Sequence, residues 1–396
     1  MQLCFGAKHT LCIRHIPGGM MSLSKYTAFL RGLPLALFTV LFSNQALAEF
    51  GLNMTEGVTP ISREIYSLHM LVFWICVVIG IGVFGVMAYS IMHHRKSKGA
   101  LAADFHESTT VEIIWTLVPL AILIAIAVPA TGTLLDLEDT SKADVNIQVN
   151  GIQWKWKYNY IDEGVEFVSQ LSEDSRNAIT NPVGVDNYLL DVDKPIVVPI
   201  NKKIRFLFTA DDVIHAWWVP ELAVKQDAVP GYINDSWAII EKPGVYRGQC
   251  AELCGKDHGF MPIVVNAVAE DEYQQWLDGM RAEAAAIAAA ADQEFTIEEL
   301  ISRGESVYAG NCAACHGPTG AGVPPVFPAL AGSPIVLGDI SDHIDIIMNG
   351  KSGTAMQAFK GQLSDVDIAA VITFKRNSFG NTVGDMVQPS TIKSLR

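Results

Sequence analysis

The sequence predicts a multidomain membrane protein with three folded parts, a two-helix transmembrane hairpin, an antiparallel β-sandwich and an all-α domain. Three observations predict this organisation. Two apolar runs each exceed the roughly 20 residues that span a bilayer as a helix. A middle region alternates apolar and polar residues with a period of two. A Cys-x-x-Cys-His motif then lies in a final region that has no βαβ pattern.

The composition narrows the class of protein. Of the 396 residues, 50% are hydrophobic, which is too apolar for an ordinary soluble protein, so we expect contact with a membrane. The net charge of −14 disfavours nucleic acid as a partner and would steer a basic protein toward the chain.

The N-terminal stretch has the pattern of a targeting segment. Lys25 and Arg31 precede a short apolar run, 33–42, and the tripeptide Ala46-Leu47-Ala48. A basic region, a short apolar core and an A-x-A end are typical of a secretory signal peptide. We therefore predict that residues 1–48 are a cleaved signal peptide.

Residues 49–136 are predicted to form the transmembrane hairpin, with helices at about 65–92 and 111–135. The segment between them, 93–98, is rich in Lys, Arg and His. Clustered Lys and Arg mark the cytoplasmic side of a membrane, so both outer ends of the hairpin should face the opposite side. A buried hairpin in a large soluble protein is the alternative, which this charge placement disfavours.

The second predicted helix opens with Thr109-Thr110-Val111-Glu112. This pattern indicates a capping box, in which the Thr109 side chain binds the backbone of the first turn and Glu112 folds back toward it. The carboxylate is also favoured near the positive end of the helix dipole.

Residues 137–270 are predicted to form the sandwich. Short alternating stretches such as 145–150 and 203–208 are separated by Pro, Gly and Asp. Period-two alternation with turn residues at this spacing favours an antiparallel sandwich. The aromatic-rich stretch 153–160 is explained first by core packing along one strand.

A candidate metal site lies late in this region, at the spacing Cys250-x3-Cys254-x3-His258-x2-Met261. Soft sulfur ligands combined with imidazole select copper. His215, far upstream, offers a second imidazole. A disulfide between the two cysteines and a zinc knuckle are the alternatives, although zinc rarely uses Met.

Residues 271–295 contain the alanine-rich run 281–292. Ala and Glu are good helix formers, so this stretch is predicted to be a partly helical, semi-rigid linker. The domain after it is predicted to cover residues 296–396.

Within the last domain, Cys312-Ala-Ala-Cys315-His316 is the signature of covalent c-type haem attachment, with His316 as the proximal ligand. A thioredoxin-like redox pair is the alternative, but that motif belongs near a βαβ unit. The candidates for the sixth iron ligand are Met348, Met356, Met386 and His343.

Segments 215–231 and 244–263 resemble the copper A domain of cytochrome c oxidase subunit II, which implies a cupredoxin-like fold. In that family two thiolates bridge two coppers, and a Glu residue contributes its backbone carbonyl. Carried over by matching positions, the resemblance implies the copper ligands His215, Cys250, Glu252, Cys254, His258 and Met261.

The same resemblance implies further roles. It assigns Trp154 as the exposed ring through which electrons arrive from cytochrome c. It places Glu112, in the pattern Val111-Glu112-Ile113-Ile114-Trp115-Thr116, at the mouth of a proton channel in subunit I. It also implies that the Glu252 carboxylate and Asp227 lie at a magnesium or manganese ion near subunit I.

The C-terminal region resembles a class I cytochrome c domain. Gly304 matches the position where the first helix is crossed closely by the last, here 365–376. Met356 matches the distal loop best, although Gln357 follows it where the family commonly has Pro. Met together with His raises the potential of the haem iron, which suits electron delivery to copper.

Together these resemblances imply subunit II of a caa3-type haem–copper oxidase. It would accept electrons from cytochrome c or another periplasmic donor and pass them through haem c and copper A to subunit I, with subunit III as a further partner. It would lie in a bacterial inner membrane with both redox domains on the periplasmic side. The alternative is a subunit of another copper A enzyme such as nitrous oxide reductase, which the hairpin disfavours.

Overall fold

A computed structural model describes residues 53–101, 104 and 106–396. The chain divides into two units, Met1–Asn53 and Met54–Arg396, and the elements described below belong to the second. The predicted signal peptide, residues 1–48, lies outside the described residues.

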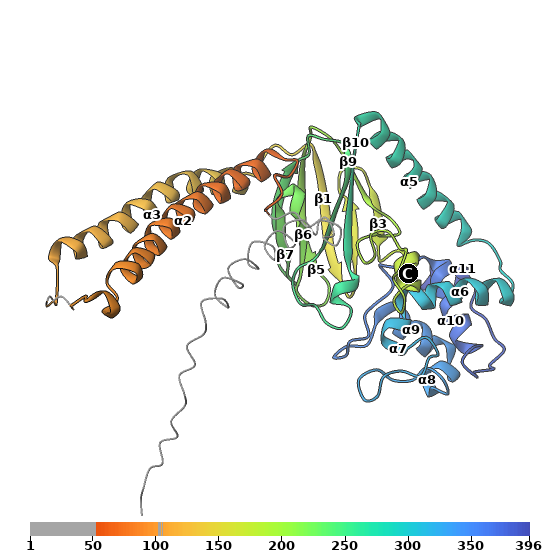
Figure 1. Cartoon of the computed structure of the whole chain (residues 1–396). Coiled ribbons are helices and arrows are strands. Elements are labelled where there is room, and N and C mark those ends of the chain that lie inside the picture. Colours follow the sequence, from red (N-terminus) through yellow and green to blue (C-terminus); the bar gives the residue numbers. More distant parts are fainter. Residues whose placement is uncertain (1–52, 102–103, 105) are drawn as a thin grey trace, which may run out of the picture. The chain divides into compact units, whose positions relative to one another are not determined.

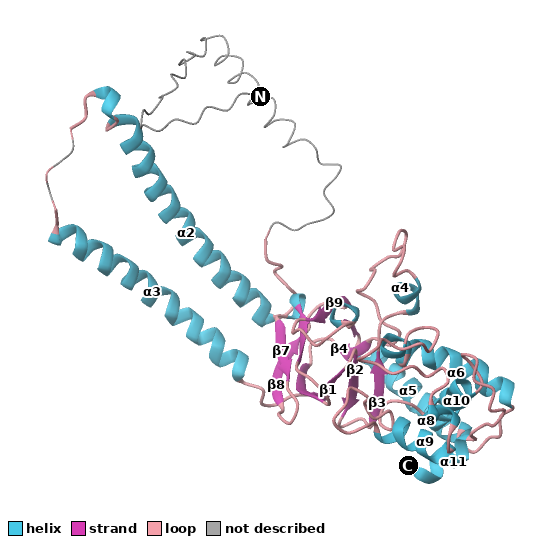
Figure 2. Ribbon diagram, turned by 90° about the horizontal axis from the view of Figure 1, so that it is seen from below, coloured by secondary structure: helices cyan, strands magenta, loops and turns pink. Residues whose placement is uncertain are grey.

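The hairpin consists of α2 (Pro60–His93) and α3 (Thr109–Glu138), with the short helix η1 (Lys96–Lys98) between them (Figures 1 and 2). Both helices are a few residues longer than predicted. They are the two helices in the described part of the chain that have the length and hydropathy to cross a membrane. In the most apolar stretch of each helix, 0% of the residues are buried by the rest of the chain. These apolar side chains are therefore expected to contact lipid.

The first helix is attached to the sandwich at its start. Thr59 caps α2 by accepting a hydrogen bond from Ser62 N, and its hydroxyl donates to Leu222 O across 3.2 Å. Two hydrogen bonds of 2.8 and 2.9 Å join the Arg63 guanidinium to the Glu241 carboxylate. These contacts set the direction in which the helix leaves the sandwich.

The middle domain is a sandwich of two five-stranded sheets within the described residues, with the orders β3-β2-β1-β5-β8 and β4-β10-β9-β6-β7. The strands are β1 (Val145–Ile152), β2 (Lys155–Tyr160), β3 (Val165–Ser169), β4 (Ile196–Pro199), β5 (Lys203–Ala210), β6 (His215–Val219), β7 (Val224–Ala228), β8 (Asn234–Ile239), β9 (Gly244–Cys250) and β10 (Pro262–Val268). The short helices α4 (Glu173–Asn177), η2 (Pro220–Leu222) and η3 (His258–Phe260) lie in its connections.

The predicted sandwich is confirmed, with one refinement of its strand directions. Most neighbouring strands are antiparallel, but β1 pairs with β5, and β4 with β10, in parallel. A parallel pair requires a long crossover connection, which period-two alternation cannot reveal because it reports only which face of a strand is buried.

Aromatic side chains fill the space between the two sheets. Trp156, Tyr158 and Tyr160 on β2 are at most 1% exposed, as the core-packing interpretation predicts. The Tyr160 hydroxyl donates to Val197 O across 2.6 Å, and Trp217 Nε1 donates to the Tyr158 hydroxyl across 3.2 Å. The polar ends of Tyr158, Tyr160 and Trp217 are therefore hydrogen-bonded inside the core, whereas Trp156 Nε1 has no hydrogen-bond partner among the described residues.

The stretch predicted as a linker, 271–295, is largely one continuous helix, α5 (Glu270–Ala290). Its first half is packed, because Tyr273 and Leu277 are 1% and 0% exposed and join the core of the sandwich. The alanine-rich second half is mostly exposed. The connection without helix is therefore only residues 291–296.

The last domain is all-α, as predicted. Its helices are α6 (Ile297–Asn311), α7 (Ala313–His316), α8 (Pro334–Leu337), α9 (Ile340–Asn349), α10 (Asp365–Arg376) and α11 (Pro389–Leu395). A side chain at Gly304 of α6 would collide with Ala370 and Phe374 of α10, so the close crossing predicted at Gly304 is present. The helix 365–376 is not the last one, because α11 follows it.

Candidate metal centre and haem site

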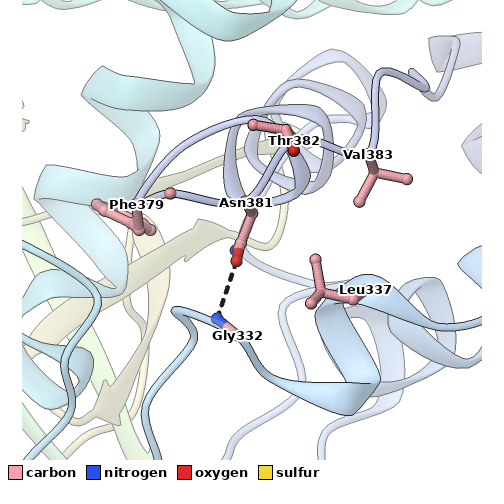
Figure 3. A pocket seen from close by; sticks show the side chains of 7 residues that line it. Gly332, Leu337, Phe379, Asn381, Thr382 and Val383 are labelled. Carbon is pink, nitrogen blue, oxygen red and sulfur yellow. Dashed lines mark hydrogen bonds between the residues drawn. The ribbon is translucent and has the colours of Figure 1, made fainter.

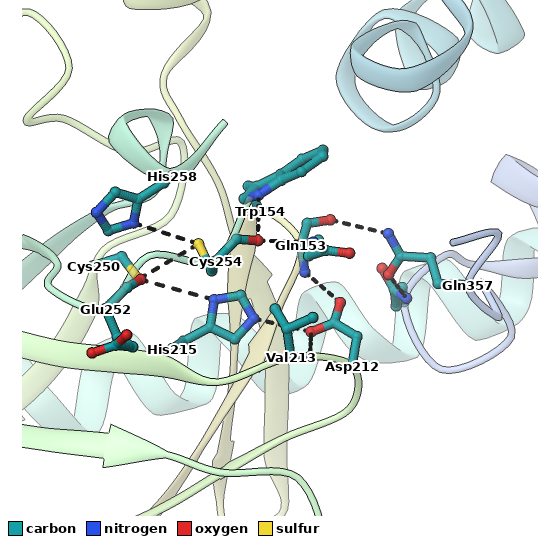
Figure 4. A network of polar contacts seen from close by, with 11 residues as sticks. Gln153, Trp154, Asp212, Val213, His215, Cys250, Glu252, Cys254, His258 and Gln357 are labelled. Carbon is teal, nitrogen blue, oxygen red and sulfur yellow. Dashed lines mark hydrogen bonds and ion pairs between the residues drawn. The ribbon is translucent and has the colours of Figure 1, made fainter. Parts of the chain in front are cut away.

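Two neighbouring strands bring the distant halves of the metal site together. β6 begins at His215 and β9 ends at Cys250, and the two strands pair antiparallel, with Trp217 opposite Cys250. The start of one strand and the end of the other therefore lie at the same end of the sheet. The turn after β9 carries Cys254 and His258 to the same place (Figure 4).

The ligand atoms form a compact cluster. The two cysteine sulfurs lie 3.8 Å apart, Cys250 Sγ lies 3.9 Å from His215 Nδ1, and Cys254 Sγ lies 3.5 Å from His258 Nδ1. The ligand atoms of His215, Cys250 and Cys254 lie within 4.8 Å of one another, as a metal site requires. Both thiols are free, so the structure contains no disulfide between them.

The remaining predicted ligands lie on the same loop. Glu252 O is 3.4 Å from Cys250 Sγ, and its side chain points away into solvent. Met261 is 1% exposed at the foot of the loop. Thiolates, imidazoles, a thioether and a carbonyl together fit copper, the softest of the candidate metals.

The electrostatics favour the ligating thiolate form of one of the two cysteines, Cys250. Contact with the Cys254 thiol, helped by His215, lowers the pKa of Cys250, although burial opposes this shift. The same pairing and burial raise the pKa of Cys254. One thiolate is thus stabilised before any metal binds, and the thiolate is the form that ligates metals.

His215 is held by residues that sequence reasoning missed. Asp212 Oδ1 lies 3.0 Å from His215 Nε2, which leaves Nδ1 facing the sulfur. Burial of His215 is the largest influence and opposes protonation, but the hydrogen bonds and negative charges of Asp212 and Cys250 together outweigh it and raise the pKa of the imidazole. A Cβ at Gly151 would lie 2.7 Å from the ring, so only glycine leaves room for it.

Trp154 lies directly against residues 251–261, the loop between β9 and β10, which is called the metal loop below. Its Nε1 donates to Cys254 O across 3.2 Å. The ring is half-buried rather than fully exposed, because it packs against the edge of the sandwich core.

The Cys-x-x-Cys-His motif occupies α7 and the residue before it. Cys312 and Cys315 are free thiols on this single turn. His316 Nδ1 lies 2.9 Å from Pro328 O and donates to it, which leaves Nε2 as the free ligating nitrogen. Burial lowers the pKa of His316, so the neutral ring that a metal needs is favoured. These residues fit a covalently held haem.

The candidates for the sixth ligand differ in their surroundings. Met348 is 2% exposed within the helical core, and Met386 is 44% exposed. His343 is buried with no hydrogen-bond partner for Nδ1 among the described residues, and burial lowers its pKa to about 2. Met356 is half-buried in the loop after α9, where its backbone is fixed by a bond of 2.9 Å from Lys351 N to Met356 O.

The predicted capping box at the start of α3 is wrong. The N-cap is Ser108 rather than Thr109, and no side-chain hydrogen bond caps this helix end in the described residues. Glu112 is exposed in the first turn, so its carboxylate is available for another role. Asp227 on β7 is exposed as well, and no hydrogen bond joins it to Glu252 in the part that the structure describes.

A shallow pocket lies elsewhere in the helical domain, and none of the predicted haem residues lines it (Figure 3). Asn381 Oδ1 accepts a hydrogen bond of 2.9 Å from Gly332 N across it. Its lining is Gly332, Leu337, Phe379, Gly380, Asn381, Thr382 and Val383.

Three family profiles match the chain. Residues 48–132 match the transmembrane domain of cytochrome c oxidase subunit II, and residues 145–268 match the periplasmic domain of that subunit. Residues 299–374 match the family described as cytochrome c oxidase, cbb3-type, subunit III.

Curated relatives agree with these profiles. The probable cytochrome c oxidase subunit 2 of Rickettsia bellii is 38% identical over 254 residues, which are 63% of this chain and 93% of the relative. Cytochrome c oxidase subunit 2 of Cereibacter sphaeroides is 34% identical over 58% of this chain and 80% of its own length. Among solved structures, the periplasmic domain of subunit II of the Bradyrhizobium japonicum oxidase is 41% identical and covers 36% of this chain and 98% of its own, with a TM-score of 0.33.

A membrane-anchored cupredoxin-like domain joined to a cytochrome c domain defines a class of redox proteins that serve respiratory enzymes. Within this class, the matched hairpin and periplasmic domain are decisive, and the chain belongs to the cytochrome c oxidase subunit II family. The family implies copper A in the sandwich, and the C-terminal profile implies a haem in the helical domain. The protein is therefore an oxidase subunit in a membrane, and the alternative copper A enzymes receive no support.

Proposed function

We propose that this chain receives electrons on a covalently attached haem c and passes them through a dinuclear copper A centre to the haem and copper of subunit I, where oxygen is reduced to water. Cys312, Cys315 and His316 would hold the haem, with Met356 as the sixth ligand. The dinuclear copper would be held by His215, Cys250, Glu252 O, Cys254, His258 and Met261. When bound, these groups supply two one-electron redox centres.

One contact carries the proposal. Lys256, within the metal loop between Cys254 and His258, donates from Nζ to Ala314 O across 2.6 Å. Ala314 lies between the two cysteines of the haem motif. The loop that would hold copper and the helix α7 that would hold the haem are thus in direct hydrogen-bond contact, which suits electron transfer inside the chain.

Trp154 is the aromatic group that this arrangement favours for transfer. Its indole bonds directly to the backbone of Cys254, and its partly exposed ring borders the cytochrome domain's side of the metal loop (Figure 4). We assign it to the path of electrons into the copper site.

Further assignments extend the proposal. Glu112 would take part in proton uptake near subunit I, and Glu252 and Asp227 would contribute carboxylates to a magnesium ion at that interface. Subunit III and a periplasmic donor such as cytochrome c complete the complex in a bacterial inner membrane.

The test is flash photoreduction of the haem in the detergent-purified oxidase, with the near-infrared absorbance of copper followed in time. We expect the copper band to bleach as the haem is reoxidised, and replacement of Trp154 by Phe should slow this step. Cys250→Ser should abolish the copper band and leave the haem spectrum unchanged. Copper that stays oxidised while the haem decays by another route would refute the proposal.

A further inference from the structure

Two glutamine side chains connect the cytochrome domain to the metal loop. Gln357, next to Met356, donates from Nε2 to Gln153 O across 3.0 Å. Gln153 in turn donates from its own Nε2 to Cys254 O across 2.8 Å. We call this chain of two hydrogen bonds the amide bridge; Figure 4 shows it passing beside Trp154.

The orientation of the Gln357 amide is fixed by a third glutamine. Gln362 donates from Nε2 to Gln357 Oε1 across 3.0 Å and to Ala358 O across 2.7 Å. Because the oxygen of Gln357 is occupied in this way, its NH2 group faces Gln153 O. In both hydrogen bonds of the bridge, the donor therefore lies on the side of the Met356 loop and the acceptor on the side of the metal loop.

Gln153 is connected to both halves of the metal site. Its side chain bonds to Cys254 O, as above, and its backbone N donates to Asp212 Oδ2 across 2.7 Å. The other oxygen of Asp212 holds His215. A contact made by the cytochrome domain at Gln153 O thus reaches a cysteine and a histidine of the copper site through one residue.

Basic side chains of the sandwich form further hydrogen bonds to the cytochrome domain and so help to keep the two ends of the amide bridge together. Arg176 donates to Ala309 O and Gly310 O across 3.2 and 3.0 Å, and Lys155 donates to Asn311 Oδ1 across 2.9 Å. These acceptors form the carboxyl end of α6, where the last carbonyls lack partners within the helix and the helix dipole favours cations.

We propose that the amide bridge is a second electron-transfer contact between the two domains, parallel to Trp154, and that Gln357 and Gln153 are positioning residues for this step. The inference rests on the proposed function. The transfer moves one electron: the haem iron is oxidised from ferrous to ferric and the copper pair is reduced by one electron, while the amides exchange no proton. A continuous path of bonds and hydrogen bonds couples two centres better than a gap between surfaces does.

The experiment uses the full-length chain in the purified oxidase. Gln357→Glu keeps the shape of the side chain but replaces the donor by a carboxylate oxygen, and Gln357→Met removes the donor without adding charge. Gln293→Glu is the matched control, because it makes the same change of charge at an exposed position between α5 and α6. For each protein we would measure the photoinduced haem-to-copper transfer rate and the backbone hydrogen exchange of residues 150–160 and 352–362.

Both Gln357 variants should slow the transfer severalfold relative to the control, because breaking the hydrogen-bonded path weakens the coupling between the two centres. Both should also increase exchange in the two segments, while the static copper spectrum stays unchanged and the control behaves like the parent. Rates and exchange equal to those of the control would overturn the inference. Failure of the proposed function looks different, because the unsubstituted enzyme would then show no haem-to-copper transfer at all.

Discussion

At the scale of single residues, the carboxylate of Asp212 fixes the orientation of the His215 ring, so that Nδ1 faces the metal site. Groups that hold a ligating histidine commonly change metal affinity by about 10- to 100-fold when they are mutated. We therefore expect Asp212→Asn to weaken copper binding by a factor in that range, measured by competition with a chelator. Asp211→Asn removes the same charge from the exposed neighbouring residue and should leave the affinity unchanged. Equal affinities for the two variants would show that Asp212 does not act through His215.

The sixth haem ligand is a second question at this scale. Met356→Ala should remove the absorbance typical of methionine bound to low-spin iron and lower the reduction potential of the haem. Met348→Ala should leave both unchanged but cost about 2–5 kcal/mol of stability, because Met348 is buried in the helical core. If Met348→Ala abolishes the signature instead, the distal ligand has been assigned to the wrong loop.

Residues differ in how well their roles can be predicted from sequence. Cys250, Cys254 and His258 lie within nine residues of one another, so their spacing alone exposes a metal site. Gln153 and Gln357 are 204 positions apart and meet only because the domains pack together. No local pattern distinguishes them from ordinary polar residues. Asp212 had a weak signal, a carboxylate three residues before a candidate ligand.

At the scale of helices and strands, the crossing of α6 and α10 depends on the missing side chain of Gly304. Gly304→Ala places a methyl group against the backbone of Ala370, and overpacking of this kind costs about 1–3 kcal/mol. The midpoint temperature of thermal unfolding, followed by the absorbance of the haem, should therefore decrease. Gly279→Ala in α5 is the control, because nothing lies near its Cβ position and alanine there should stabilise the helix by up to about 1 kcal/mol. Similar effects of the two substitutions would contradict the close crossing.

The first turn of α3 offers a test at the same scale. Since no side chain of the described residues caps this helix, Glu112→Gln should leave helix content unchanged and lower thermal stability only by the small helix-dipole contribution of the carboxylate. If Glu112 takes up protons, turnover coupled to proton uptake should fall, whereas Glu107→Gln, at an exposed position before the helix, should be silent. Normal turnover in Glu112→Gln would leave the carboxylate with only a local electrostatic role.

Helix α5 shows that composition can predict a helix correctly and still not reveal that the helix is packed against a domain. Its alanine-rich sequence indicates helix correctly, but low complexity suggests a linker without packing. Tyr273 and Leu277 precede the alanine run and anchor the helix in the sandwich core. Likewise, the alternating strands indicate a sandwich but not its parallel pairs, because those depend on the order of strands in space.

At the scale of the whole molecule, α5 changes how the tether acts. A 21-residue helix is about 30 Å long, and its first half is fixed to the sandwich. The cytochrome domain is therefore joined to the sandwich by a rigid helix, and only residues 291–296 can act as a hinge. It samples far fewer positions than a domain on a flexible coil would. Its effective concentration at the metal loop should exceed the millimolar range that short flexible linkers provide.

Ending the chain after Ala290 tests this consequence of the fusion. The sandwich keeps every core residue, including Tyr273 and Leu277, so the copper spectrum and the unfolding of the copper domain should be preserved. The carbonyl of Gln153 loses its hydrogen-bond donor, and Lys155, Arg176 and Lys256 lose their acceptors on the cytochrome domain. Oxygen consumption should then depend on added soluble cytochrome c and should saturate with its concentration, since a bimolecular encounter replaces an intramolecular one. A truncated enzyme that oxidises the native donor as fast as the full chain, without any addition, would show that electrons enter this protein by a route that bypasses the fused domain.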